Sequence, residues 1–244
     1  MTDGAAPVAD AAEEEVVRPS RAELARAQRA RSAELRIRHG IGSRRRAERL
    51  MRGMDIVLVL VLAPLALALI GASAVAIKID TRGPVFFRQK RTGMNGRRFT
   101  IWKLRTMVVD AEAQKSSLMG RTMAQGAAFK LSDDPRVTRV GRVLRKLNLD
   151  ELPQLWNVLR GDMGIVGPRP TSAPSTTYDL WQTARLSTRP GLTGAWQVTP
   201  RKNEMPFDER VRVDIRYQRN RSLAGDVRLI VRTATHAVVR RQGM

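Results

Sequence analysis

The sequence contains no cysteine and only two histidines, His39 and His236. The absence of cysteine excludes disulfides, cysteine-ligated zinc and thiol catalysis. With only two imidazoles, a multi-histidine metal site or a serine-histidine-aspartate triad is not expected. A bound metal would therefore be a hard cation with oxygen ligands, such as Mg²⁺. The 244 residues are enough for one domain, or for one domain with an arm.

Acidic residues are also scarce relative to basic ones. The chain has 23 Asp and Glu residues against 44 Lys and Arg residues, which gives a formal net charge of +21. This surplus favours a polyanionic partner, and nucleic acid, anionic lipid and phosphorylated substrates all fit. For any single arginine, an ordinary solvated surface position remains the alternative.

One long uncharged stretch, Ile56 to Ile77 (IVLVLVLAPLALALIGASAVAI), interrupts this basic sequence. It is long enough to cross a bilayer as a helix, which needs roughly 20 residues. A signal peptide is a poor fit, because the run begins deep in the chain and lacks a clear cleavage site. A core helix that is apolar all round would need a large protein around it. The run therefore predicts a membrane helix.

The environment of this run argues against a simple span. Pro64 lies inside it, where proline removes a helical hydrogen bond and kinks the helix. Basic residues flank both ends, at 44–52 and at 78–91. Because positive charge favours the cytoplasmic side, a helix that enters the membrane, breaks at Ala63-Pro64 and returns keeps both clusters there. A kinked spanning helix is the alternative.

Residues 1–50 form a separate arm in this interpretation. Residues 1–17 are rich in alanine and acidic side chains, and we expect them to be disordered. Ser20 and Glu23 then form a capping-box pattern that starts an arginine-rich helix. Such a helix can lie on anionic lipid headgroups, remain solvated, or pack on the catalytic domain or a second subunit. The predicted units are thus the arm 1–50, a membrane helix 51–80 and a domain 81–244.

The segment Val85 to Met107 predicts a β-hairpin. Two β-prone stretches surround Asn95-Gly96, a dipeptide typical of hairpin turns. In the second stretch, Phe99 and Ile101 are expected on one side and Lys103 elsewhere.

Two helices are predicted after the hairpin. Residues 136–147 form the first, which is strongly basic. In LDELPQLWNVLRGDM, Pro153 suits the first turn of the second and Gly161 its end. Asp150 and Glu151 then lie at or just before a helix N-terminus, where the dipole favours their ionised forms. Spacing alone favours the interpretation that they are first-turn caps.

Two Gly- and Pro-rich loops follow. GIVGPRP (164–170) presents Arg169, and TRPGLTGAWQV (188–198) presents Arg189. Such loops bring backbone amides and a guanidinium to a phosphate. Ordinary turns between structural elements explain the glycine and proline residues as well. The tail 207–240 predicts a helix, a short break near Gly225 and a second helix.

Taken together, these segments resemble the bacterial sugar transferases known as monotopic polyprenyl-phosphate phosphoglycosyl transferases, in their small, catalytic-core form. The resemblance runs from about Arg49 to the C-terminus and depends on an ordered set of motifs. They are Asp55 with the apolar run, GPVFFRQKRTG, FTIWKLRTM, LDELPQLWNVLRGDMGIVGPRP, RPGLTGAWQV, VDIRY and DVRLI. The chain departs from the family where a Gly-Arg-Asn pattern usually follows the Gln-Val, since it has Thr199-Pro200-Arg201-Lys202-Asn203 there.

The resemblance implies an α+β, mostly helical, monotopic membrane protein with a re-entrant helix-break-helix, a β-hairpin and amphipathic interfacial helices. It implies that Asp150 and Glu151 form a catalytic dyad that also holds Mg²⁺. In the family, the aspartate attacks a nucleotide diphosphosugar, a UDP-sugar by expectation, and a polyprenyl phosphate then takes the phosphosugar. The positions that match other family site residues are Lys103, Arg145, Arg169, Arg189 and Asp214.

The expected partners are therefore a nucleotide sugar, a polyprenyl phosphate and anionic membrane lipids, with the arm as a candidate homodimer contact. The expected location is the inner or plasma membrane, with the catalytic domain on the cytoplasmic face. Two other functions account for parts of the sequence. A membrane-tethered nucleic-acid-binding protein explains the charge but not the ordered loops, and a non-catalytic scaffold of the same fold does not explain the intact Asp-Glu pair.

Overall fold

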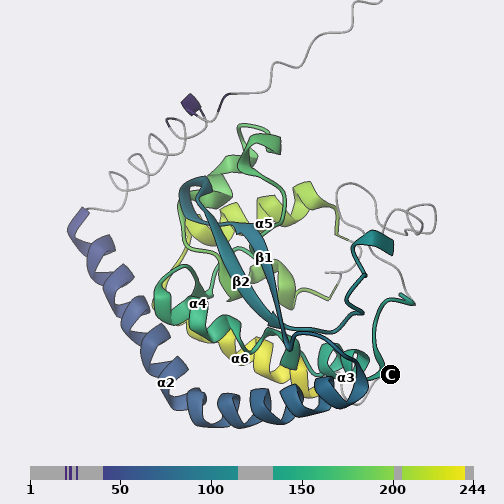
Figure 1. Cartoon of the computed structure of the whole chain (residues 1–244). Coiled ribbons are helices and arrows are strands. Elements are labelled where there is room, and N and C mark those ends of the chain that lie inside the picture. The colour runs from purple at the N-terminus through teal and green to yellow at the C-terminus, as the bar shows by residue number, and fades with distance from the viewer. Residues whose placement is uncertain are drawn as a thin grey trace, which may run out of the picture.

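The fold is described from a computed structural model (Figure 1). It describes residues 20, 22, 23, 26, 41–114, 134–200 and 205–239, so residues 1–17 and 201–203 lie outside the described part. The helices are α2 (Ile41–Asp80), α3 (Arg139–Lys146), α4 (Gln154–Arg160), α5 (Phe207–Arg219) and α6 (Leu223–Val239). The strands are β1 (Phe86–Thr92), β2 (Arg98–Leu104), β3 (Gly164–Val166) and β4 (Gly191–Thr193). This is the mostly helical α+β fold that the sequence predicts.

Helix α2 carries the apolar run and bends around one side of the domain (Figure 1). Over Arg46–Asp80 it is long and apolar enough to cross a membrane, and large side chains such as Leu60, Val61 and Leu67 are mostly exposed. The helical assignment continues through Ala63 and Pro64. The interruption expected at this pair is therefore a bend within one helix, because a proline removes only one internal hydrogen bond.

Two buried apolar clusters attach α2 to the domain. Val59, from the first half of the helix, packs with Phe99 and Ile101 of the hairpin. Ile77, near its end, packs in a second cluster with Leu104 and Leu144. Burial of apolar area holds both contacts together. Both halves of the bent helix therefore rest on the same domain.

Polar bonds secure the two ends of the apolar run. Near its start, Asp55 Oδ1 accepts from the Ile165 amide at 3.0 Å. Arg52 donates to the last carbonyls of α4, at 2.6 and 2.8 Å. At the far end, Asp80 Oδ2 accepts from the Val140 amide at 3.1 Å, which satisfies a free donor in the first turn of α3. Arg105 donates to the carbonyls of residues 81 and 82.

The predicted hairpin is confirmed, with β1 and β2 antiparallel and Asn95 in the left-handed region at φ 55°. The expected direction of Lys103 is wrong. Directly paired residues share a face, and side chains alternate along a strand. Lys103 therefore lies on the same face as Phe99 and Ile101.

The short strands β3 and β4 pair in parallel and join the two Gly- and Pro-rich loops. Their backbones approach closely at Gly191, where an added Cβ would lie 2.1 Å from the Gly167 nitrogen. Glycine is therefore required at this position, and the two loops form one unit.

The buried residues of α4 are Gln154, Asn157 and Val158, whereas Trp156 is 55% exposed. Asn157 faces inward because it satisfies backbone groups of β2. Its Nδ2 donates to the Thr100 carbonyl at 2.7 Å, and its Oδ1 accepts from the Trp102 amide. In the tail, the break lies at 220–222 rather than at Gly225, which is in the first turn of α6.

A buried ion pair joins α5 to the 3₁₀ helix Gln182–Ser187. Arg185 Nη2 lies 2.7 Å from Asp214 Oδ2, and the two side chains are 3% and 0% exposed. The Arg185 guanidinium also lies over the ring of Phe207, 5.7 Å from its centroid. Burial of two charges is tolerated only because each compensates the other.

We predict that single substitutions of this pair are much more damaging than the double substitution. Arg185→Met or Asp214→Leu should each lower the free energy of unfolding by about 3–5 kcal/mol, because each leaves a buried charge unpaired. The double variant should lose far less than the sum of the two. Denaturant unfolding of the detergent-solubilised chain measures all three.

Arg216→Met is the matched control, because Arg216 is exposed on the same helix. It should change the stability by less than about 0.5 kcal/mol. Additive losses in the double variant would show that the two charges do not compensate each other.

Candidate active site

Asp150 and Glu151 lie in a 3₁₀ turn, Leu149–Glu151, directly before α4. The turn follows Asn148, which has a left-handed backbone at φ 56°. This reversal turns the chain out of α3, and Pro153 leads it into α4. The adjacent carboxylates therefore stand at the junction of two helices, facing β2.

Glu151 is bound by two cations from different elements. Lys103 Nζ, on β2, donates to Glu151 Oε1 at 2.7 Å. Arg169, in the loop after β3, donates to both carboxylate oxygens, to Oε2 at 3.2 Å. Burial alone would raise the pKa of Glu151, but Arg169 and Lys103 outweigh it and lower that pKa to about 2. Glu151 is therefore ionised.

Asp150 has a different environment. It is 9% exposed, and its nearest cation is Lys103, whose Nζ lies 3.8 Å from Oδ2. Burial raises the pKa of Asp150, and Lys103 only partly offsets it. This corrects the expectation that the helix dipole keeps the pKa low. The helix that follows has only seven residues, so loss of solvent has the larger effect.

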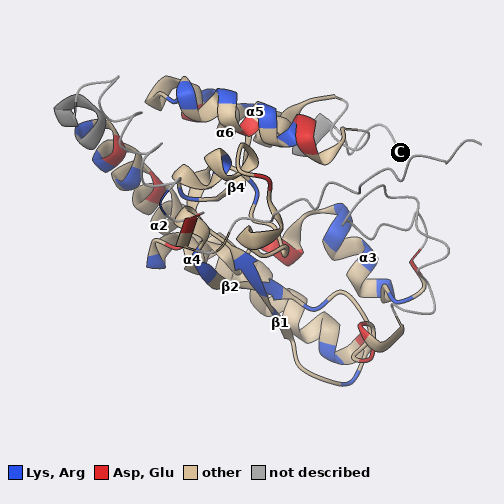
Figure 2. Ribbon diagram, turned by 90° about the horizontal axis from the view of Figure 1, so that it is seen from above, with Lys and Arg blue, Asp and Glu red and all other residues tan. Residues whose placement is uncertain are grey.

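Arg145 supplies positive charge to Asp150 from the C-terminal end of α3. Its Nε donates to Thr106 Oγ1 at 2.8 Å, which fixes the guanidinium. Burial lowers the pKa of Arg145, and Asp150 counteracts that shift. Figure 2 shows basic residues along α3 and on the hairpin strands that flank the dyad. The aspartate is thus framed by cations.

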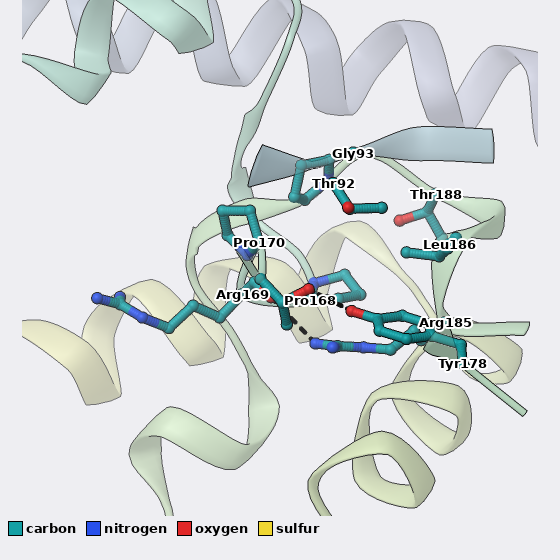
Figure 3. Close-up of a pocket in the computed structure, with 11 residues that line it drawn as sticks. Thr92, Gly93, Pro168, Arg169, Pro170, Tyr178, Arg185, Leu186 and Thr188 are labelled. Atoms are coloured by element: carbon teal, nitrogen blue, oxygen red, sulfur yellow. Dashed lines mark hydrogen bonds between the residues drawn. The ribbon is translucent and has the colours of Figure 1, made fainter. Parts of the chain in front are cut away.

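The loop that carries Arg169 is held from behind by the buried ion pair. Arg185 Nη2 donates to the Arg169 carbonyl at 3.0 Å. In Figure 3 the Arg169 guanidinium points away from Arg185 and Tyr178, which lie on the other side of the loop. A small pocket of about 210 Å³, including space open to solvent, lies on that other side. The pocket is therefore separate from the dyad.

The structure brings together four of the predicted residues around Asp150, namely Lys103, Arg145, Arg169 and Glu151. Asp214 is not among them, because it is fully buried against Arg185 and acts on Arg169 only through that residue. Arg189 is partly buried, and its side chain forms no hydrogen bond or ion pair with the described residues.

Two residues near the dyad were not predicted. Arg185 lies in a stretch with no recognisable pattern, and only the fold pairs it with Asp214. Arg91 was quoted within GPVFFRQKRTG but given no role. The signal that could have identified Arg91 is its strand position. Arg91 pairs with Phe99, which lies four positions before Lys103 on β2, so Arg91 and Lys103 are on the same face of the hairpin.

The acidic residues can be tested against the expected Mg²⁺. In the described ranges, no group of three or more His, Cys, Asp or Glu side chains could enclose a metal ion. Mg²⁺ is, however, commonly held by one or two carboxylates together with substrate phosphates. Asp150, whose one ion pair among the described residues is the 3.8 Å contact with Lys103, fits that mode better than Glu151, whose two oxygens already bind cations.

Comparison with known proteins finds bacterial proteins of similar sequence, several of them named as sugar transferases. The galactosyl transferase CpsE of Streptococcus agalactiae is 45% identical over 152 residues, which cover 62% of this chain and 34% of that protein. The exopolysaccharide production protein ExoY of Sinorhizobium fredii is 40% identical over 73% of this chain and 79% of its own length. A UDP-glucose:undecaprenyl-phosphate glucose-1-phosphate transferase of Caulobacter vibrioides is 40% identical over 75% and 67%.

The chain thus spans about a third of the length of CpsE and most of the length of ExoY. The family model described as bacterial sugar transferase matches residues 46–240, which include α2, the hairpin, the dyad and both glycine-rich loops. On this match, the chain belongs to the bacterial sugar transferase family.

Proposed function

We propose that this chain transfers a sugar 1-phosphate from a UDP-sugar to a polyprenyl phosphate in two steps at Asp150. In the first, an Asp150 oxygen bonds to the sugar-bearing phosphorus, and the bond from that phosphorus to the nucleoside monophosphate breaks. In the second, an oxygen of the polyprenyl phosphate bonds to the same phosphorus, and the bond to Asp150 breaks. The product is a polyprenyl diphosphosugar, and Asp150 is regenerated.

The observation that supports Asp150 as the nucleophile is the unequal environment of the two carboxylates. Glu151 is already neutralised by Lys103 and Arg169, so its lone pairs are engaged. In the part of the chain that the structure describes, Asp150 has no bond of that strength, and its nearest cation is at 3.8 Å. A buried carboxylate with few hydrogen bonds is the better nucleophile of the two, because less has to be broken before it attacks.

The cations around Asp150 address the main barrier, which is the repulsion between a carboxylate and a phosphate. Lys103 and Arg145 both act on its carboxylate, and fixed positive charge near the developing negative charge lowers the barrier. Mg²⁺, when bound by Asp150 and the substrate phosphates with Glu151 beside it, would supply further neutralisation. Glu151 then acts as the anchor that keeps Lys103 and Arg169 in place.

The donor and acceptor are inferred from the names of relatives. The Caulobacter protein is named for UDP-glucose and undecaprenyl phosphate. Others are named for galactose or N-acetylgalactosamine with the same lipid carrier, and ExoY for exopolysaccharide production. These names share the reaction and differ in the sugar. We therefore assign the reaction class, and place it at the first membrane step of exopolysaccharide synthesis.

The attachments of α2 support a re-entrant membrane helix over 51–80, with the catalytic domain 81–244 on one side. Asp55 and Asp80 bond to the same domain from the two ends of the run. A helix that crossed the bilayer would separate its ends by about 30 Å of hydrocarbon. Basic residues at both ends favour the cytoplasmic face of the inner membrane.

Most of the arm 1–50 lies outside the described residues. Its capping box is present, with Ser20 N donating to Glu23 Oε2 at 2.7 Å and Glu23 N to Ser20 Oγ at 3.3 Å. We assign the basic helix that follows to anionic lipid headgroups, with a second subunit as the other candidate.

Labelling of engineered cysteines tests the topology. The chain has no native cysteine, so Leu50→Cys and Arg82→Cys each provide a single thiol. In inverted and right-side-out vesicles, both thiols should react with a membrane-impermeant maleimide from the cytoplasmic side only. Reaction of the two positions from opposite sides would establish a spanning helix and contradict the proposal.

An activity assay tests the role of Asp150. The purified chain with polyprenyl phosphate, Mg²⁺ and a panel of UDP-sugars should release UMP, and Asp150→Asn should reduce release by about a thousandfold or more. Mass spectrometry of the wild type without acceptor should find a phosphosugar adduct on Asp150. Asp179→Asn is the control, because Asp179 is an exposed aspartate away from the dyad. A fully active Asp150→Asn variant would rule out the assignment.

The raised pKa of Asp150 predicts the acid side of the pH profile. Attack requires the ionised carboxylate, so kcat/KM for the donor should fall as the pH drops through a pKa above the ordinary 3.8. Lys103→Met removes the cation that most lowers this pKa, and should move the fall to higher pH while reducing the rate. Glu151, with a pKa of about 2, contributes nothing in this range. An unchanged midpoint in Lys103→Met would contradict the assignment.

A further inference from the structure

Arg91 lies on the same face of the hairpin as Lys103. The register pairs Arg91 with Phe99, and Lys103 with a residue at the start of β1. Paired residues share a face, and positions two apart on a strand do as well. Arg91 is partly buried on this face, whereas its neighbour Lys90 is exposed. The face that positions Lys103 against Glu151 therefore also carries Arg91.

Arg91 is a cation without an anionic partner of its own. Its Nη2 donates to the neutral amide of Gln89, and its Nη1 to the Pro170 carbonyl at a long 3.4 Å. Its Nε is buried and unbonded. Among the residues that the structure describes, no carboxylate forms an ion pair with Arg91. A partly buried guanidinium in this state is costly unless an anion binds it.

The electrostatics of the site also show that the positive charge of Arg91 is not fully compensated. Burial and the nearby Arg169 lower the pKa of Arg91 to about 10, and Glu151 offsets this only in part. Glu151 is already shared between Lys103 and Arg169. Lys103, Arg145, Arg169 and Arg91 are thus four cationic side chains near the two carboxylates, and Arg98 adds further positive charge at Arg91. This excess of positive charge favours the binding of a phosphate group, which carries nearly two negative charges.

Arg91 lies on the Arg169 side of the dyad. It is influenced by Glu151 and Arg169, whereas the cations that act on Asp150 are Lys103, Arg145 and Arg169. Arg91 Nη1 donates to the carbonyl of Pro170, the residue that follows Arg169. The phosphorus attacked by Asp150 lies on the other side. Arg91 is therefore placed for a neighbouring phosphate.

We propose that Arg91, together with Arg169, forms a phosphate-binding subsite beside the dyad, on the side away from Asp150. This rests on the proposed function. In an in-line displacement, the incoming and leaving groups lie on opposite sides of phosphorus. The nucleoside monophosphate leaves on the side away from Asp150, and the polyprenyl phosphate enters from that same side. Both the nucleoside monophosphate and the polyprenyl phosphate thus present a phosphate group to Arg91.

Binding of inorganic pyrophosphate to the full chain in nanodiscs, followed by isothermal titration calorimetry, tests the subsite without turnover. Arg91→Gln should weaken binding by about tenfold to a hundredfold, the effect of one lost hydrogen bond to a charged group. Lys90→Gln, which removes the same charge from the exposed face, should change it less than about twofold. Arg91→Lys should be intermediate, because it keeps the charge but loses the fork.

Equal binding by the Arg91→Gln and Lys90→Gln variants would overturn the proposal, and so would a wild type that binds no pyrophosphate. Arg91→Lys, with unchanged thermal unfolding, separates a loss of binding from a loss of folding. Titrations with UMP and with a short-chain polyprenyl phosphate identify the source, and weaker binding in either arm supports the subsite. A wild type that binds pyrophosphate but turns over no nucleotide sugar would refute the proposed function and leave the subsite intact.

Discussion

The ion-pair centre at Glu151 is the interaction on which the site depends. One carboxylate joins Lys103 from the hairpin, Arg169 from the loop after β3, and its own turn before α4. Because the centre is largely shielded from water, each ion pair is stronger than on a surface, and loss of the carboxylate would leave two cations facing each other. Glu151 thereby fixes the cations that face Asp150.

The loop carrying Arg169 is supported from two directions. Upstream, the Ile165 amide of β3 is bonded to Asp55 of α2, and β3 pairs with β4 at a glycine contact too close for any side chain. At Arg169 itself, the carbonyl is bonded to Arg185, which is held by Asp214. The backbone is thus fixed on the side of Arg185, while the guanidinium points away from Arg185 (Figure 3) and binds Glu151. Such support holds the backbone of a short, irregular loop in a fixed position, as a regular strand would.

The same contacts connect the membrane helix to the chemistry. Asp55 belongs to the helix that carries the apolar run. Its carboxylate accepts a hydrogen bond from β3, the strand that leads to Arg169. At the other end, Asp80 caps α3, which carries Arg145. Each end of the bent helix is therefore attached to an element that supplies a cation to the dyad. On the proposed topology, this positions the dyad at the membrane surface, where a lipid-linked acceptor can reach it.

The hairpin and the order of the main helices were predicted from the sequence alone, whereas the short parallel strands β3 and β4 were not. Alternation and the Asn-Gly turn fixed the hairpin, helical spacing fixed α3, α5 and α6, and the length of the apolar run fixed α2. Each of these is a local property, decided by neighbours a few residues apart. The adjacency of Asp150 and Glu151, and the motifs that mark the family, are likewise local.

Tertiary structure decided how those residues differ. Asp150 and Glu151 are neighbours in sequence, but burial raises one pKa and two distant cations lower the other. Asp214 carries a family pattern, yet only the fold shows it paired with Arg185 behind the loop. Arg91 becomes notable only when the strand register puts it on the Lys103 face and its side chain bonds to Pro170, next to Arg169, without an acidic partner among the described residues. Desolvation and long-range charge depend on which segments meet in space, and a linear pattern does not contain that information.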